Sequence, residues 1–124
     1  MRKVLVVEDS PAMRGLIASI VDQIEDCEVV EAPNGYEALK QLPRNTFSLI
    51  ITDINMPDIN GLELLSYIRK SPNYVDTPVL IVTTEAAERD RERGMALGAS
   101  AYVVKPFEAD ELFEAARGLL DGEK

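Results

Sequence analysis

Carboxylate, hydroxyl and ammonium side chains recur at one kind of position in this sequence, at the end of a short apolar run. They are, in chain order, Glu8 and Asp9, Asp53, Thr83 and Thr84, and Lys105 followed by Pro106. Taken singly, each has an ordinary structural explanation, such as a helix-start carboxylate, a turn residue or a solvated cation. If the apolar runs are strands of one parallel sheet, however, these side chains gather at one edge of it.

Such a cluster would suit phosphoryl chemistry. Three close carboxylates repel one another unless a cation is present, and Mg²⁺ is the natural hard ion for oxygen ligands. A magnesium ion held by one or two carboxylates keeps positions open for a phosphate. Lys105 would neutralise one phosphoryl oxygen, and the Thr83 hydroxyl would donate to another. An aspartate, rather than Ser, Cys or His, is placed as the nucleophile, and carboxylates form aspartyl-phosphates.

The elements that would position these residues follow from hydropathy. Runs rich in Val and Ile predict five β-strands, at Val4–Val7, Glu28–Glu31, Ser48–Thr52, Val79–Thr83 and Ala101–Val104. At least 15 residues separate each run from the next, which is too long for hairpins and suits helical crossovers.

Apolar residues at helical spacing fill those gaps. The first gap has the clearest stripe, at Met13, Leu16, Ile17, Ile20, Val21 and Ile24. Ser10 is the expected N-cap of that helix, and Pro11 its first residue. Four further helices are expected, on Tyr36, Leu39 and Leu42; on Leu62, Leu65 and Ile68 behind the cap Asn60; over the highly charged Ala86–Leu97; and on Leu112–Leu120 behind Asp110.

This alternation predicts an α/β fold, a doubly wound (βα)5 parallel five-stranded sheet of flavodoxin-like type. The first, third and fourth runs are the most uniformly apolar and should be central, whereas the second and fifth carry polar residues and suit edges. Right-handed crossovers then favour the order 2-1-3-4-5 over the dinucleotide-binding order 3-2-1-4-5, which would bury the second strand. The ligand site is expected between the first and third strands.

Composition limits the other possibilities. The 124 residues predict one domain, 1–124, and 46% of them are apolar, enough for a core. A net charge of −9 argues against nucleic-acid or membrane binding. One cysteine and no histidine exclude an internal disulfide, a zinc cluster and a histidine-based triad. With no export signal or membrane-spanning run, the cytoplasm is the expected compartment.

The pattern resembles the receiver domain of bacterial two-component response regulators, and specifically the CheY-like single-domain type. The resemblance covers essentially the whole chain and rests on Glu8-Asp9, the run Asp53-Ile-Asn55-Met-Pro57, Gly61, Thr83, Gly98-Ala99, Tyr102 and Lys105-Pro106-Phe107.

The resemblance implies a role for each matching residue of the site. Asp53 would accept a phosphoryl group from the phosphohistidine of a sensor histidine kinase or phosphotransfer protein. Asp9 and Asp53 would bind Mg²⁺ through their side chains, Asn55 through its backbone carbonyl, and Glu8 through a water molecule. Lys105 would contact the phosphoryl group. The protein would assist its own phosphorylation and dephosphorylation without being an enzyme with external turnover.

The resemblance also implies a switch. Thr83 would move to bond the phosphoryl group, and Tyr102 would swing into the vacated space. The face formed by the fourth helix, fifth strand and fifth helix would then change its target protein, in a monomer or a phosphorylation-dependent dimer. The Lys105–Pro106 peptide bond would be cis. Thr84 stands where the family more often has a small residue and would narrow access to the phosphoryl group.

Other functions fit the sequence less well. A flavin-binding relative would cradle a phosphate in its first loop, where Glu8 and Asp9 would repel it. An aspartate-nucleophile phosphatase would carry Asp-x-Asp where this chain has Glu-Asp. An NTPase would need the phosphate-loop motif, which is absent. A degenerate receiver that only binds partners remains the non-catalytic alternative.

Overall fold

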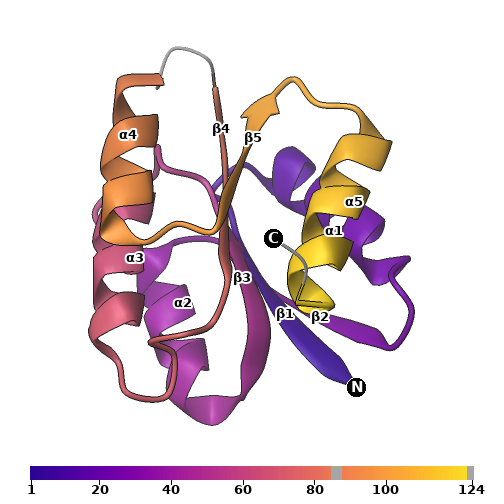
Figure 1. Ribbon diagram of the computed structural model, residues 1–124, viewed down its shortest axis with the longest axis horizontal. Coiled ribbons are helices and arrows are strands. Elements are labelled where there is room, and N and C mark those ends of the chain that lie inside the picture. Colours follow the sequence, from indigo (N-terminus) through magenta and orange to yellow (C-terminus); the bar gives the residue numbers. More distant parts are fainter. Residues whose placement is uncertain (85–87, 123–124) are drawn as a thin grey trace.

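A five-stranded parallel sheet forms the centre of the molecule (Figure 1). The computed structural model describes residues 1–84 and 88–122, with the side chains of 88–90 left out. The strand order is β2-β1-β3-β4-β5, which confirms the predicted fold and topology. The strands are β1 (Arg2–Val7), β2 (Cys27–Ala32), β3 (Phe47–Thr52), β4 (Val79–Thr84) and β5 (Ala101–Lys105).

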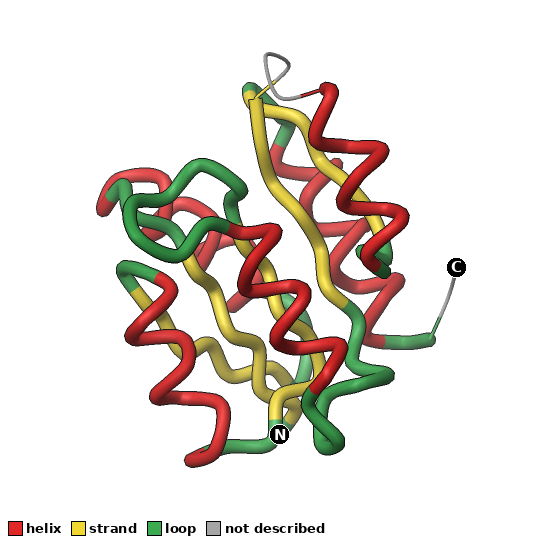
Figure 2. Tube along the Cα trace, turned by 90° about the vertical axis from the view of Figure 1, so that its left-hand side faces the viewer, coloured by secondary structure: helices red, strands yellow, loops and turns green. Residues whose placement is uncertain are grey.

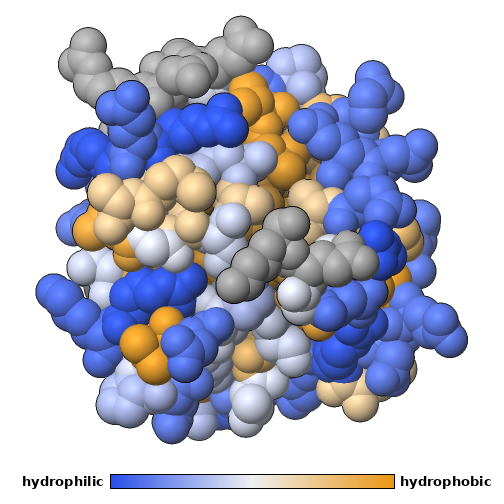
Figure 3. Space-filling model, viewed as in Figure 1, coloured by the Kyte–Doolittle hydropathy of each residue, from blue (hydrophilic) through white to orange (hydrophobic). Residues whose placement is uncertain are grey.

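Helices cover both faces of this sheet, as Figures 1 and 2 show. One face carries α1 (Pro11–Asp22) and α5 (Ala109–Leu120). The other carries α2 (Gly35–Gln41), α3 (Gly61–Lys70) and α4 (Glu88–Leu97), with a short 3-10 turn at Leu42–Arg44. Within the described ranges, every helix is too short or too polar to cross a bilayer. Hydrophilic residues cover much of the face seen in Figure 3.

The sheet divides the apolar interior into two clusters because successive strand side chains point to opposite faces. On β4, Ile81 belongs to the cluster under α2 and α3, whereas Leu80 and Val82 belong to the cluster under α1 and α5. Thr83 therefore points to the same side as Ile81. Tyr102 of β5 also packs against that first cluster.

Caps set where two of the helices begin, and hence how the chain leaves the site end of the sheet. The Ser10 hydroxyl accepts a hydrogen bond from the Met13 backbone N–H at 3.3 Å, and Pro11 opens α1. Asn60 and Glu63 form a reciprocal capping box at the start of α3. Both predicted caps are confirmed, and such a cap typically contributes about 1 kcal/mol.

The structure departs from the expected helices in detail. Leu16 is 47% exposed and Tyr36 is 55% exposed, so both lie at the margins of their apolar stripes, facing solvent. Leu42 belongs to the 3-10 turn, because Pro43 lacks the N–H that would extend α2. The charged helix begins at Glu88, and the predicted start at Ala86 lies outside the described residues.

Candidate functional site

The register of the sheet brings the predicted site residues together at its carboxyl edge. Val7 of β1 pairs with Thr52 of β3, so the residues that follow, Glu8 and Asp53, lie side by side. The backbone N–H of Asp53 donates to the Val7 carbonyl at 3.2 Å, continuing the ladder by one residue. In the β4–β5 pair, Thr84 of β4 lies opposite Lys105 of β5.

An ammonium group joins the two buried carboxylates. Lys105 Nζ lies 3.1 Å from Glu8 Oε1 and 3.2 Å from Asp53 Oδ2. Glu8 is only 1% exposed and Asp53 is 7% exposed, whereas Asp9 is open to solvent. One oxygen from each of Glu8, Asp9 and Asp53 can be chosen so that all three lie within 4.8 Å of one another. The three carboxylates, predicted from the ends of two strands, therefore form one cluster.

Burial and neighbouring charge perturb these groups. Burial, together with the adjacent Asp53 carboxylate, raises the pKa of Glu8 to about 7 and outweighs the opposing effect of Lys105. For Lys105, burial alone would lower the pKa, but the contacts with Glu8 and Asp53 dominate and raise it. Negative charge is thus in excess at this edge, and one ammonium group only partly compensates it.

A hard divalent cation fits these residues. Glu8 Oε2 is buried and has no hydrogen-bond partner among the described residues. The donor set consists of carboxylate oxygens, which Mg²⁺ and Ca²⁺ prefer, and contains no thiolate or imidazole. A buried oxygen without a hydrogen-bond partner lowers the stability of the folded protein, and a bound cation would offset that loss.

The chain after Asp53 turns back sharply beneath the site. The Gly61 N–H donates to the Ile54 carbonyl at 2.9 Å, which closes the loop onto the start of α3. A Cβ at Gly61 would lie 2.8 Å from Ile54 Cα and would overlap the Asp53 carbonyl oxygen. Within the loop, the exposed residue Asn55 donates its backbone N–H to Asp53 Oδ1 at 3.3 Å. Glycine at position 61 is therefore a condition for placing Asp53.

Two further predicted residues lie on the sheet face that carries α4. Thr83 is 2% exposed, and its hydroxyl lacks a hydrogen-bond partner in the part of the chain that the structure describes. Tyr102 is partly buried and packs against the cluster under α2 and α3. The peptide bond between Lys105 and Pro106 is cis, as the resemblance implied.

Arg14 is a site neighbour that the sequence interpretation missed. Its Nη1 donates to the Glu8 carbonyl at 2.9 Å, and its Nε lies 3.3 Å from Glu31 Oε1 of β2. The guanidinium thus ties the end of β1 to the neighbouring edge strand. The sequence feature that could have indicated Arg14 is its position, one turn beyond the N-cap Ser10 on the helix that starts directly after Glu8 and Asp9.

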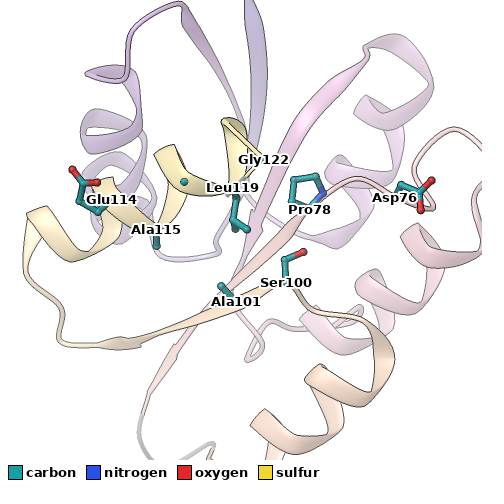
Figure 4. A pocket seen from close by; sticks show the side chains of 9 residues that line it. Asp76, Pro78, Ser100, Ala101, Glu114, Ala115, Leu119 and Gly122 are labelled. Carbon is teal, nitrogen blue, oxygen red and sulfur yellow. The ribbon is translucent and has the colours of Figure 1, made fainter. Parts of the chain in front are cut away.

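A cavity of about 640 Å³ lies away from these carboxylates. Figure 4 shows its lining, which includes Pro78 ahead of β4, Ala101 at the start of β5 and Leu119 of α5. These residues mark the opposite end of the strands from the carboxylates. A second cavity of about 540 Å³ adjoins the site loop, between Asn55 and the α3 and α4 residues Glu63 and Leu97. The site carboxylates Glu8, Asp9 and Asp53 line neither of these two cavities.

The comparisons with known proteins agree with this geometry. Residues 4–117 match the family model for the response regulator receiver domain. A chemotaxis protein CheY homolog of Campylobacter jejuni is 38% identical over 119 residues, 95% of this chain and 92% of that protein. Chemotaxis protein CheY1 of Helicobacter pylori is 35% identical over 113 residues, 90% of this chain and 91% of that protein.

A solved structure shows the same relationship. The chemotaxis protein CheY4 of Vibrio cholerae superimposes with a TM-score of 0.88 at 34% identity, covering 96% of this chain and 98% of that one. Receiver domains bind a divalent metal in an acidic pocket, and Glu8, Asp9 and Asp53 form such a pocket here. The chain therefore belongs to the CheY-like receiver domains of two-component response regulators.

Proposed function

We propose that this chain is a phosphorylation switch in which Asp53 accepts a phosphoryl group from a histidine kinase or phosphotransfer protein. The observation that carries the proposal is the Lys105 ammonium, 3.1 Å from Glu8 and 3.2 Å from Asp53 at the carboxyl edge of the sheet. This contact places a cation against a carboxylate that is accessible at one edge yet mostly buried. Family membership supports the same role for the domain as a whole.

The chemical step is an exchange of one bond to phosphorus for another. A carboxylate oxygen of Asp53 bonds to phosphorus as the bond from phosphorus to the donor imidazole nitrogen breaks. The imidazole keeps the electron pair and takes a proton from solvent, and Asp53 becomes an acyl phosphate. Lys105 then offsets the charge that collects on the phosphoryl oxygens.

Asp9, Asp53 and the backbone carbonyl of Asn55 would hold Mg²⁺, with Glu8 acting through a bound water. When bound, the ion supplies positive charge that offsets the carboxylates and a phosphoryl oxygen. Glu8 and Asp9 themselves add charge that repels a bare phosphate, so phosphoryl transfer should require the divalent ion. This residue assignment extends the acidic pocket of the family to the individual side chains of this chain.

The phosphoryl group would signal through Thr83 and Tyr102. The Thr83 hydroxyl is buried and available to donate to a new acceptor, and Tyr102 points to the same side of the sheet. A hydroxyl drawn towards the phosphoryl group leaves space that the Tyr102 ring can occupy. The face formed by α4, β5 and α5 would then bind its target protein differently. The chain would assist its own phosphorylation and dephosphorylation and would not turn over an external substrate.

The test is a labelling experiment with a small phosphodonor. Acetyl phosphate with Mg²⁺ should add one phosphoryl group to the wild type, located at Asp53 by mass spectrometry. Asp53→Asn keeps the shape of the side chain and should abolish labelling, and removal of Mg²⁺ with a chelator should do the same. Retained labelling of Asp53→Asn at another residue would contradict the proposal, and a chain that binds Mg²⁺ but is never labelled would be a degenerate receiver.

A further inference from the structure

The Tyr102 ring lies in a recess on α4 that exists only because residue 94 is glycine. A Cβ built on Gly94 would lie 2.9 Å from Tyr102 Cζ and 3.2 Å from Cε1, and it would overlap the hydroxyl oxygen. Real Cβ atoms essentially never lie closer than 3.0 Å to another heavy atom, so the hydroxyl oxygen and Cζ could not stay where they are and a side chain at position 94 would displace the ring. Gly94 is buried, in keeping with this contact.

A cation covers the same ring. The Arg91 guanidinium carbon lies 5.7 Å from the centroid of Tyr102, within range of a cation–π interaction. Residues three apart in a helix share a face, so Arg91 and Gly94 approach the ring together. Tyr102 thus contacts both an α4 side chain and the α4 backbone surface.

The position of this ring matters because of its relation to Thr83. In the β4–β5 register, Ile81 pairs with Tyr102 and Thr83 pairs with Val104. Thr83 and Tyr102 therefore lie diagonally on the same sheet face. Movement of the ring towards Thr83 must break its contacts with α4.

We propose that Arg91 and Gly94 form a latch that holds Tyr102 against α4. The latch would thereby set the equilibrium between the inactive and the activated conformation. The proposal rests on the function proposed above for Asp53, Thr83 and Tyr102. A ligand shifts a two-state equilibrium only by its differential affinity for the states, so contacts made in one state oppose the other. Weakening the latch therefore raises the apparent affinity of the site for a phosphoryl mimic, although neither latch residue touches it.

Fluorine NMR tests the latch directly. The chain has four tyrosines, so 3-fluorotyrosine labelling gives four signals, and Tyr102→Phe assigns the one of interest. Adding Mg²⁺ and beryllofluoride to the wild type defines the direction in which the Tyr102 signal moves on activation. Gly94→Ala should move that signal in the same direction without any beryllofluoride, because the added methyl displaces the ring.

The matched control is Gly15→Ala in α1. It adds the same methyl inside a helix, and an added Cβ there meets no atom of the described residues within 4 Å. Any gain in helix propensity is therefore common to both variants. The Tyr102 signal should stay at its wild-type position in Gly15→Ala. An unchanged Tyr102 signal in Gly94→Ala would overturn the latch.

Arg91→Gln tests the cation. At fixed Mg²⁺, the beryllofluoride concentration at half-saturation should fall about two- to fivefold, the ratio that corresponds to an exposed cation–π contact. Arg44→Gln makes the same charge change in the exposed 3-10 turn and should titrate as the wild type does. Equal titrations of Arg91→Gln and the wild type would also overturn the latch.

The outcomes separate this proposal from the one on which it rests. If the wild type responds to beryllofluoride through Asp53 but the α4 variants behave normally, the latch fails and the phosphorylation switch stands. If beryllofluoride has no effect, or acts equally on Asp53→Asn, the proposed function fails. Even then, the ligand-free Tyr102 signal of Gly94→Ala decides whether Gly94 holds the ring.

Discussion

At the scale of single residues, Lys105 has two opposing effects on the acidic cluster. Its ammonium group compensates the buried Glu8 and Asp53 carboxylates, and it also occupies space at the edge where a divalent cation would bind. Opposite charges at about 3 Å in a partly buried site interact much more strongly than they would in water. Removal of this side chain should therefore affect metal binding and phosphoryl transfer in different directions.

Lys105→Ala should bind Mg²⁺ more tightly than the wild type, because a competing positive charge has gone. The same variant should accept a phosphoryl group from acetyl phosphate more slowly, because no ammonium group meets the phosphoryl oxygens. Isothermal titration with Mg²⁺ and a labelling time course measure the two effects. Lys105→Arg, which keeps the charge, should stay closer to the wild type in Mg²⁺ affinity. Weaker Mg²⁺ binding by Lys105→Ala would contradict this account.

At the scale of elements, Arg69 of α3 connects two loops. Its Nε and Nη2 donate to the Gly98 carbonyl at the end of α4, at 3.0 and 2.7 Å. Its Nη1 donates to the Thr77 carbonyl ahead of β4 at 2.7 Å. Gly98 itself has a φ of +106°, a conformation that glycine adopts without strain. One guanidinium thus joins the end of α4 to the α3–β4 connection.

Arg69→Met keeps much of the aliphatic stem but leaves these carbonyls without a donor. Unsatisfied, partly buried carbonyls typically cost about 1–3 kcal/mol, so the free energy of unfolding should fall by about that amount. Urea denaturation measures it. Amide hydrogen exchange should accelerate around Gly98 and Thr77 more than in α1. Uniform acceleration across the chain would show that Arg69 stabilises the fold only globally.

Tyr74 makes a second cross-connection, with a pH signature. Its hydroxyl oxygen lies 2.6 Å from the Leu42 carbonyl oxygen and 2.5 Å from the Asn45 carbonyl oxygen, so the two carbonyls share its single proton. Burial raises the pKa of Tyr74 above the ordinary tyrosine value of 10. The folded protein thus holds this proton longer than the unfolded chain does. The resulting stabilisation is present below pH 10 and is lost as the pH rises through the folded-state pKa.

The chain has no tryptophan, so tyrosinate absorbance near 295 nm can follow this ionisation directly. Tyr74 should ionise at a higher pH than a free phenol as the pH is raised in the folded protein. Tyr74→Phe should remove that late step and leave the remainder of the titration curve in place. Loss of an earlier step instead would contradict the assignment.

The strand order was predictable from residue types because the contrast between uniformly apolar and mixed strands reflects burial on two faces or one. The cluster of Glu8, Asp53 and Lys105 was predictable for a related reason, since parallel strands end at a common edge. The recess between Gly94 and Tyr102 was not predictable, because it depends on how α4 rotates against β5. Leu16 shows the same limit, because periodicity places a stripe but does not say how far the neighbouring α5 covers it.

At the scale of the whole molecule, a net charge of −9 gives every cation a weak stabilising effect through screening. A specific divalent-metal site would add to this stabilisation for Mg²⁺ but not for Na⁺. At about 100 times its dissociation constant, an ion that binds only the folded state contributes about 2.7 kcal/mol. MgCl₂ should therefore raise Tm more than NaCl does at equal ionic strength.

The matched variant for this comparison is Asp9→Asn, which alters the exposed member of the carboxylate cluster. Its Tm should respond to MgCl₂ and NaCl almost equally, and calorimetry with a chelator present gives the baseline. If the wild type also responds equally to the two salts, the acidic cluster is not a metal site.

The division of the interior by the sheet has an evolutionary consequence. Ile81, Thr83 and Tyr102 face α2, α3 and α4, whereas Val82 and Val103 face α1 and α5. Substitutions on the outer surface of α1 should therefore leave the packing around Thr83 and Tyr102, the proposed relay residues, unaltered. Because α1 lies outside the proposed α4–β5–α5 face, duplicated copies of such a gene would be able to diverge in the proteins that they recognise through α1 while inheriting an unchanged relay. Recognition through α1 would thus be open to selection and to redesign independently of the proposed switch.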